Sequence, residues 1–133
     1  MLAFLALSVV AACSGPAATP GPTVPPVCVA IVAVYAQIDA LQALDPATAT
    51  ADQVDDAVAN LASSWVNLRA QAQAISQEGY TALDTAINRL TLAAAALPAS
   101  MAPAEKLAEL QDEIEAVAAG AEVLQTELGC PDL

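Results

Sequence analysis

Large apolar residues recur at alternating spacings of three and four along four separate segments of the chain, and this pattern restricts the fold more than any other feature. Such spacing places the apolar side chains on one face of an α-helix. The predicted core positions are Ile31, Val34, Ile38 and Leu41 in the first segment; Val54, Val58, Leu61, Trp65, Leu68, Ala72 and Ile75 in the second; Tyr80, Leu83, Ile87, Leu90, Ala94 and Leu97 in the third; and Leu107, Leu110, Ile114, Val117, Ala121, Leu124 and Leu128 in the fourth. Four amphipathic helices within 133 residues predict an all-α protein with one domain, a four-helix bundle.

Residue types that favour helix ends flank these segments. Asp45-Pro46 ends the first helix, because the residue before a proline is driven out of the α-helical region. Thr50-Ala51-Asp52-Gln53 has the form of a capping box at the start of the second helix. Pro103 and Glu105 suit the first turn of the fourth helix.

Two glycines complete the predicted boundaries. Gly79 is expected to break the chain between the second and third helices, and Gly129 to stop the fourth. Short connections make neighbouring helices antiparallel, which predicts up-down-up-down topology. The second and fourth helices are predicted to be the longest, at about 26 residues each. If the chain termini share one end of the bundle, the N-terminal turns of these two helices should stand together at the other end.

The N-terminal residues read as an export signal. Leu2 to Val10 is an unbroken run of apolar or small residues, too short to span the ~30 Å hydrocarbon core of a bilayer. The next residues complete Val10-Ala11-Ala12-Cys13, which resembles the bacterial lipobox. That resemblance covers about the first 15 residues and implies that a signal peptide, residues 1–12, is removed. Cys13 is then lipidated and becomes the mature N-terminus.

The resemblance implies a membrane-anchored protein on the extracytoplasmic face of an exporting bacterium, similar in style to the small alanine-rich lipoproteins of high-GC bacteria. No family is recognised for the remaining residues. Signal peptides normally begin with Lys or Arg, and only Met1 precedes Leu2, so we expect an upstream start codon or a clipped chain. The competing interpretation makes Leu2 to Ala12 a buried helix of the fold. Ser, Gly and Pro directly after Cys13 argue against it.

A proline-rich segment follows. Ser14 to Val27 contains five of the nine prolines and two of the five glycines, so it favours extended conformations without a core. At ~3.1 Å per residue it can reach on the order of 40 Å. We therefore assign residues 13–27 to the lipidated cysteine and a tether, and residues 28–133 to the bundle. Thr19 and Thr23, beside prolines, are candidates for O-glycosylation or simply keep the tether soluble.

The cysteines support this division. With Cys13 assigned to lipid, Cys28 and Cys130 remain. The first opens the first helix and the second follows the fourth, and four antiparallel helices bring these points to the same end. The topology therefore predicts a disulfide between Cys28 and Cys130, against the alternative of two buried thiols.

Charge and composition exclude several functions. The chain has 15 acids against 3 bases, for a net charge of −12, which cannot neutralise a nucleic-acid backbone. Its lack of histidine removes the usual general base and zinc ligand. Ser63, Ser64, Ser76 and Ser100 have no base to activate them. We expect no enzyme activity, no cofactor and no metal.

Acids cluster at the start of the two long helices: Asp52, Asp55, Asp56, Glu105 and Glu109. Acidic residues are favoured there by the helix dipole, and we expect them to be solvated. A weak divalent-cation site is the alternative, although helix N-termini repel cations.

Apolar residues away from the predicted core positions point to a surface. Trp65 and Tyr80 occupy core positions and are expected to pack in the interior. Val27 to Ala36 is apolar all round its helix. Four positions lie off the core pattern, two of them in this run, with Tyr35 at their edge: Val29, Val32, Val66 and Leu92. These residues either lie under the tether or form a docking surface for a protein or a lipid.

Two functions fit these features. The first is a non-catalytic envelope lipoprotein whose bundle is an interaction or scaffold module, held to the membrane by N-terminal lipid and binding an envelope protein. The second is a carrier that binds a small apolar ligand or lipid between its helices. The sequence leaves the oligomeric state open.

Overall fold

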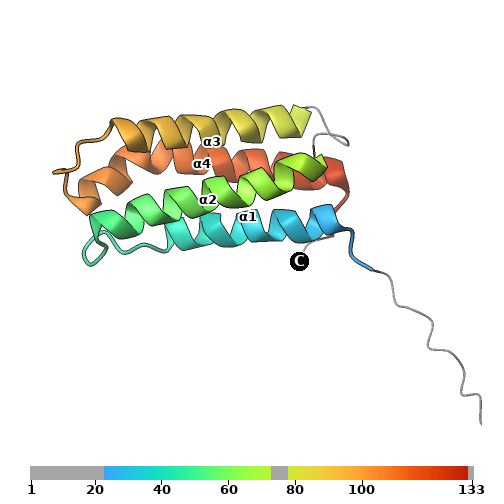
Figure 1. Ribbon diagram of the computed structural model, residues 1–133, viewed down its shortest axis with the longest axis horizontal. Helices are drawn as coiled ribbons and strands as arrows, with labels where there is room; N and C mark the ends of the chain where they lie inside the picture. The colour runs from blue at the N-terminus through green and yellow to red at the C-terminus, as the bar shows by residue number, and fades with distance from the viewer. Residues whose placement is uncertain (1–22, 73–77, 132–133) are drawn as a thin grey trace, which may run out of the picture.

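The computed structural model describes residues 23–72 and 78–131, which form four α-helices packed as a bundle (Figure 1). The helices are α1 (Pro26–Gln42), α2 (Ala51–Ala72), α3 (Glu78–Ala96) and α4 (Pro103–Leu128). Each helix packs on the next along the chain, and α4 also packs on α1, which closes the bundle. Within the described residues, α1 and α3 lie diagonally across it, and their backbones do not approach as closely as those of neighbouring helices. The predicted up-down-up-down four-helix bundle is confirmed.

The bundle has two distinct ends. The start of α1 and the end of α4 lie together at one end, which we call the proximal end (Figure 1). The α1–α2 and α3–α4 connections lie at the opposite, distal end (Figure 1). Residues 1–22, which include the predicted signal peptide and most of the predicted tether, lie outside the described residues, as does the predicted core residue Ile75.

Helix α1 begins two residues before the predicted limit at Cys28. Pro26 is its first residue, where a missing amide proton removes no helical hydrogen bond. The carbonyl oxygen of Pro25 accepts the amides of Cys28 and Val29, at 2.9 and 3.3 Å. Val27, which the sequence assigned to the tether, is therefore helical and buried.

The connection from α1 to α2 contains the predicted signals, although α1 ends at Gln42, three residues before Asp45. Asp45 Oδ1 accepts the amide of Ala47 at 2.8 Å, which turns the chain after α1 ends. At the start of α2, the Thr50 amide donates to Gln53 Oε1 at 2.8 Å, and the Gln53 amide donates to Thr50 Oγ1 at 3.2 Å. These reciprocal bonds are the predicted capping box.

The prediction that Gly79 breaks the chain is wrong, because Gly79 lies in the first turn of α3 and is buried. A Cβ atom at this position would lie 2.8 Å from Leu124 Cα, so α4 could not approach as closely. The Gly79 amide donates to Glu127 Oε2 at 2.8 Å. Gly120, on α4, allows the same close approach of α3 and α4, since a Cβ atom at this position would lie 3.1 Å from Leu83 Cα. These glycines allow close helix packing, which the turn interpretation missed.

Gly129 ends α4 as predicted. It adopts the left-handed conformation with φ +64°, which glycine tolerates without steric penalty. The Cys130 amide then donates to the Gln125 carbonyl at 3.2 Å. This turn brings Cys130 back toward α1.

The core follows the predicted heptad positions closely. Every predicted core residue in the described part of α1 and α2 is buried. Tyr80, Ala94, Leu97 and Leu128, near helix ends, are only half-buried and pack against the core. The pattern did not predict that Cys28, Ala86 and Lys106 are also buried.

Candidate functional site

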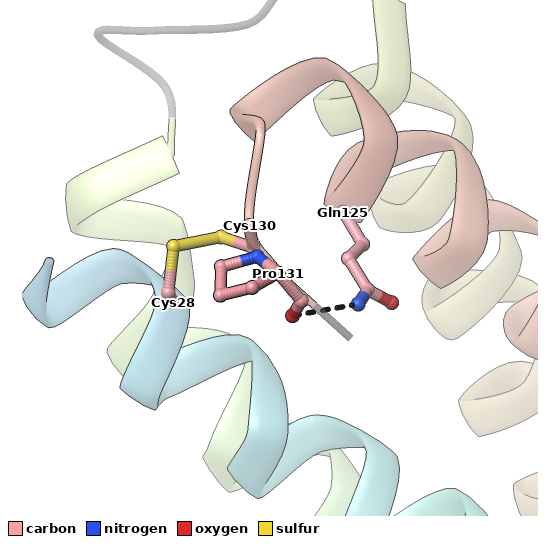
Figure 2. Close-up of a disulfide and its surroundings, with 4 residues drawn as sticks. All are labelled: Cys28, Gln125, Cys130 and Pro131. Atoms are coloured by element: carbon pink, nitrogen blue, oxygen red, sulfur yellow. Dashed lines mark hydrogen bonds between the residues drawn. A yellow bond between two sulfur atoms is a disulfide. The ribbon is translucent and has the colours of Figure 1, made fainter. Parts of the chain in front are cut away.

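A disulfide joins the two termini of the bundle at its proximal end. Cys28 and Cys130 are bonded with an S–S distance of 2.06 Å and a Cα–Cα distance of 5.5 Å. Figure 2 shows the bond between α1 and the segment after α4, where Gln125 Nε2 donates to the Pro131 carbonyl at 3.4 Å. The predicted pairing is confirmed. Of the chain's three cysteines only Cys13 is left, and it lies outside the described residues.

The predicted surface residues lie on three helices. Val29 and Val32 on α1, Val66 on α2 and Leu92 on α3 are exposed by 59, 39, 56 and 71%. Tyr35 is half-buried and packs against the core. Because α1 and α3 are diagonal in the bundle, the exposed Leu92 is separate from Val29 and Val32. Helical periodicity identified positions off the core, but it could not place them relative to the neighbouring helices.

A more compact apolar surface lies at the start of α1. Three of the six exposed large apolar residues in the described chain fall between residues 24 and 32, namely Val24, Val29 and Val32. We call them the α1 valine surface. Sequence reasoning missed Val24, which lay in the predicted tether. A usable signal was the absence of any charged residue before Asp39.

An ion pair joins the N-terminal turns of α2 and α4 at the distal end. Lys106 Nζ donates to both carboxylate oxygens of Asp55, at 3.1 and 3.3 Å. The Lys106 side chain is 4% exposed and that of Asp55 is 56% exposed. The predicted meeting of these turns is confirmed, but Asp55 is more than a solvated acid. Asp52, Asp56, Glu105 and Glu109 are exposed, as expected.

The described residues contain no group of three or more His, Cys, Asp or Glu side chains that could hold a metal ion. The acids at the start of α2 and α4 are the residues that the sequence offers for such a site. Asp55, the acid of this cluster that makes a charged contact, binds Lys106.

Removing one or the other partner of this ion pair should change the free energy of unfolding by different amounts. Asp55→Asn leaves a buried ammonium group without its carboxylate, and should destabilise the protein by about 1–2 kcal/mol, since the exposure of Asp55 weakens the pair. Lys106→Met removes the charge but keeps an apolar stem of similar length, and should change stability by less than ~1 kcal/mol. Urea unfolding measures both, with Asp56→Asn at the adjacent exposed position as the control. A larger loss from Lys106→Met than from Asp55→Asn would contradict this account.

Trp65 lies in the core, as predicted, and also takes part in a polar contact. Its side chain is 3% exposed, and its ring lies 5.3 Å from that of Tyr80, at 40°. Trp65 Nε1 donates to Asp84 Oδ1 at 2.8 Å, and Asn88 Nδ2 donates to Asp84 Oδ2 at 3.2 Å. A buried indole N–H usually finds such a partner. The sequence does not say which acid supplies it, because the contact joins two helices.

A shallow groove lies between α3 and α4 where the two helices cross closely. Its volume is about 820 Å³. Small residues form much of its wall, including Ala82, Ala86, Ala116, Ala119 and Gly120. Glu78 and Arg89 lie at its edge, on α3. Its apolar wall makes it the candidate site for a small apolar ligand.

None of the helices in the described part of the chain is both long and apolar enough to cross a membrane. No protein-family model, curated protein or solved structure matches the chain.

Proposed function

We propose that the protein is a lipoprotein of the bacterial cell envelope, anchored through lipid on Cys13, and that its bundle is a non-catalytic interaction or scaffold module. One observation carries the proposal, the pairing of Cys28 with Cys130. Exported proteins commonly use their cysteines in disulfides, and this pair accounts for two of the three cysteines of the sequence. The remaining cysteine is the one that directly follows Val10-Ala11-Ala12.

The position of α1 supports an anchor at this cysteine. Twelve residues, 14–25, separate Cys13 from the first residue of α1. An extended proline-rich chain of this length reaches roughly 37 Å at ~3.1 Å per residue. The bundle would therefore stay close to the bilayer, with its disulfide-linked proximal end nearest the anchor.

The interior of the bundle supports a function that uses the outer surface. Leu, Ile, Val, Ala and one Trp make up most of the buried residues. The one charged side chain that is buried in the described residues, Lys106, is paired with Asp55. A catalytic group usually needs a polar, desolvated site with a perturbed environment. The packing favours binding through the surface.

Replacing the proposed anchor should change where the protein is found. Cys13→Ala should move the protein from the membrane fraction to the soluble fraction or block its maturation, because a chain without acyl groups has no lipid to hold it. The matched control is Cys28→Ser combined with Cys130→Ser, which removes the disulfide but should leave the protein in the membrane fraction. Fractionation and the mass of the mature N-terminus measure the result. An unchanged fraction with an unmodified N-terminal mass would refute the anchor.

The second function, a carrier of a small apolar ligand, has one feature in its favour, the apolar groove between α3 and α4. A groove of this kind can hold part of a lipid chain, although ligand sites usually bury most of the ligand. Native mass spectrometry of the purified protein for bound lipid, set against capture of envelope proteins, distinguishes the two functions.

A further inference from the structure

We propose that the α1 valine surface lies against the lipid surface of the membrane that anchors the protein, with Val24, Val29 and Val32 in contact with lipid. This inference rests on the proposed anchor at Cys13. It adds an orientation: the bundle is not only tethered, but turns the start of α1 toward the bilayer.

The distribution of charge along the chain is the first support. The sequence contains 18 charged residues, and none of them precedes Asp39. In contrast, α4 carries seven acids: Glu105, Glu109, Asp112, Glu113, Glu115, Glu122 and Glu127. Charged groups pay a large desolvation penalty at an apolar phase. The start of α1 can therefore approach lipid without burying a charge of its own, as can residues 90–104, but only the start of α1 adjoins the proposed tether.

The exposed side of α1 is the second support. The outer face of a helix in a water-soluble bundle is normally polar or charged. On the first turns of α1 that face presents Val29 and Val32 together with exposed alanines at positions 33 and 36, and its first charged residue is the exposed Asp39. Val24, which lies two residues before the helix on the side of the tether, is 43% exposed. This strip is small, so it suits a weak contact that a nearby anchor supports.

The position of this surface next to the tether is the third support. Only ten residues, 14–23, lie between Cys13 and Val24. If Cys13 holds the bilayer at that distance, the local concentration of lipid around the valines is high, so even a weak contact forms. Membrane binding commonly combines one acyl anchor with a second, weaker signal in this way.

The size of the surface favours lipid over a second copy of the chain. A helix of 17 residues is about 25 Å long, so a strip ~10 Å wide covers about 250 Å², well below the ~800 Å² per partner of a stable interface. A net charge of −12 on each chain also opposes association of two copies. The same charge is repelled by anionic headgroups, so we expect the contact on neutral lipid.

The test places a fluorescent reporter on this surface in the full-length lipidated protein. Val29→Trp is compared with Leu92→Trp, the matched control on the diagonally opposite helix. Both variants keep the buried Trp65 as a common background. Each is reconstituted in phosphatidylcholine vesicles whose acyl chains are either brominated or unmodified. Bromine quenches only tryptophan that reaches the lipid, so Val29→Trp should lose emission in brominated vesicles and Leu92→Trp should not.

Each outcome bears on the proposal. If the protein floats with the vesicles but Val29→Trp emits equally in brominated and unmodified vesicles, or Leu92→Trp is quenched as strongly, the specific lipid contact is overturned and the anchor stands. Failure to float, with no lipid mass on Cys13, would overturn both. If Val29→Trp is not quenched and chemical cross-linking joins two copies of the protein, the valines contact a second copy and not lipid. Val24→Trp, which precedes the helix, provides a second probe that does not depend on the folding of Val29→Trp.

Discussion

Replacing Trp65 by alanine should destabilise the protein by about 3–5 kcal/mol, as large aromatic-to-alanine changes in a core do. The Trp65 side chain is 3% exposed and packs against Tyr80. Its loss leaves a cavity between α2 and α3 and leaves Asp84 without the indole donor. Total stabilities of small domains are of the order of 5–15 kcal/mol, so this change removes a large share.

Urea unfolding measures the effect, and two variants define its origin. Val66→Ala, at the adjacent position with 56% exposure, should change stability by less than about 0.5 kcal/mol. Trp65→Phe keeps most of the apolar volume but removes the bond to Asp84, and should fall between the other two. A small loss in Trp65→Ala combined with loss of a binding partner would instead make Trp65 a binding residue.

Breaking the Cys28–Cys130 disulfide should have an effect of similar size. The bond joins residues 102 positions apart, and closing a loop of about 100 residues stabilises a protein by up to ~4.7 kcal/mol in the chain-entropy model. Cys28→Ser combined with Cys130→Ser should lose most of this amount, because the unfolded chain regains its freedom while the packing of α1 on α4 is retained.

Unfolding with and without a reducing agent measures this contribution. Reductant should destabilise the natural protein to the level of the double serine variant and leave that variant unchanged. Two thiols that react with an alkylating agent in protein isolated from the envelope would contradict the disulfide.

Features that depend on local chain geometry were predictable from the sequence. The core positions Leu61, Leu68 and Val117 follow from the helical period, which any helix-forming segment must obey. The capping box of Thr50 and Gln53 depends on residues within one turn. The disulfide was predictable because four antiparallel helices bring the first and last turns together.

Features that depend on the distance between two helices were not predictable. Gly79 looked like a chain break, whereas it is helical because α4 passes too close for a side chain. The buried Lys106 pairs with Asp55 on another helix, and the Trp65 indole donates to Asp84 on α3. No local pattern shows these partners, because they are set by how the helices rotate against one another.

The candidate surface shows the same division. The sequence by itself determined that the chain forms four helices, that Val29 and Val32 lie off the core, and that no charge precedes Asp39. Only the tertiary structure decided that Val24 is also exposed and that Leu92 lies apart, on the helix diagonally opposite α1. Helical periodicity is a property of each segment alone, whereas the neighbours of an exposed side chain depend on the order and rotation of the packed helices.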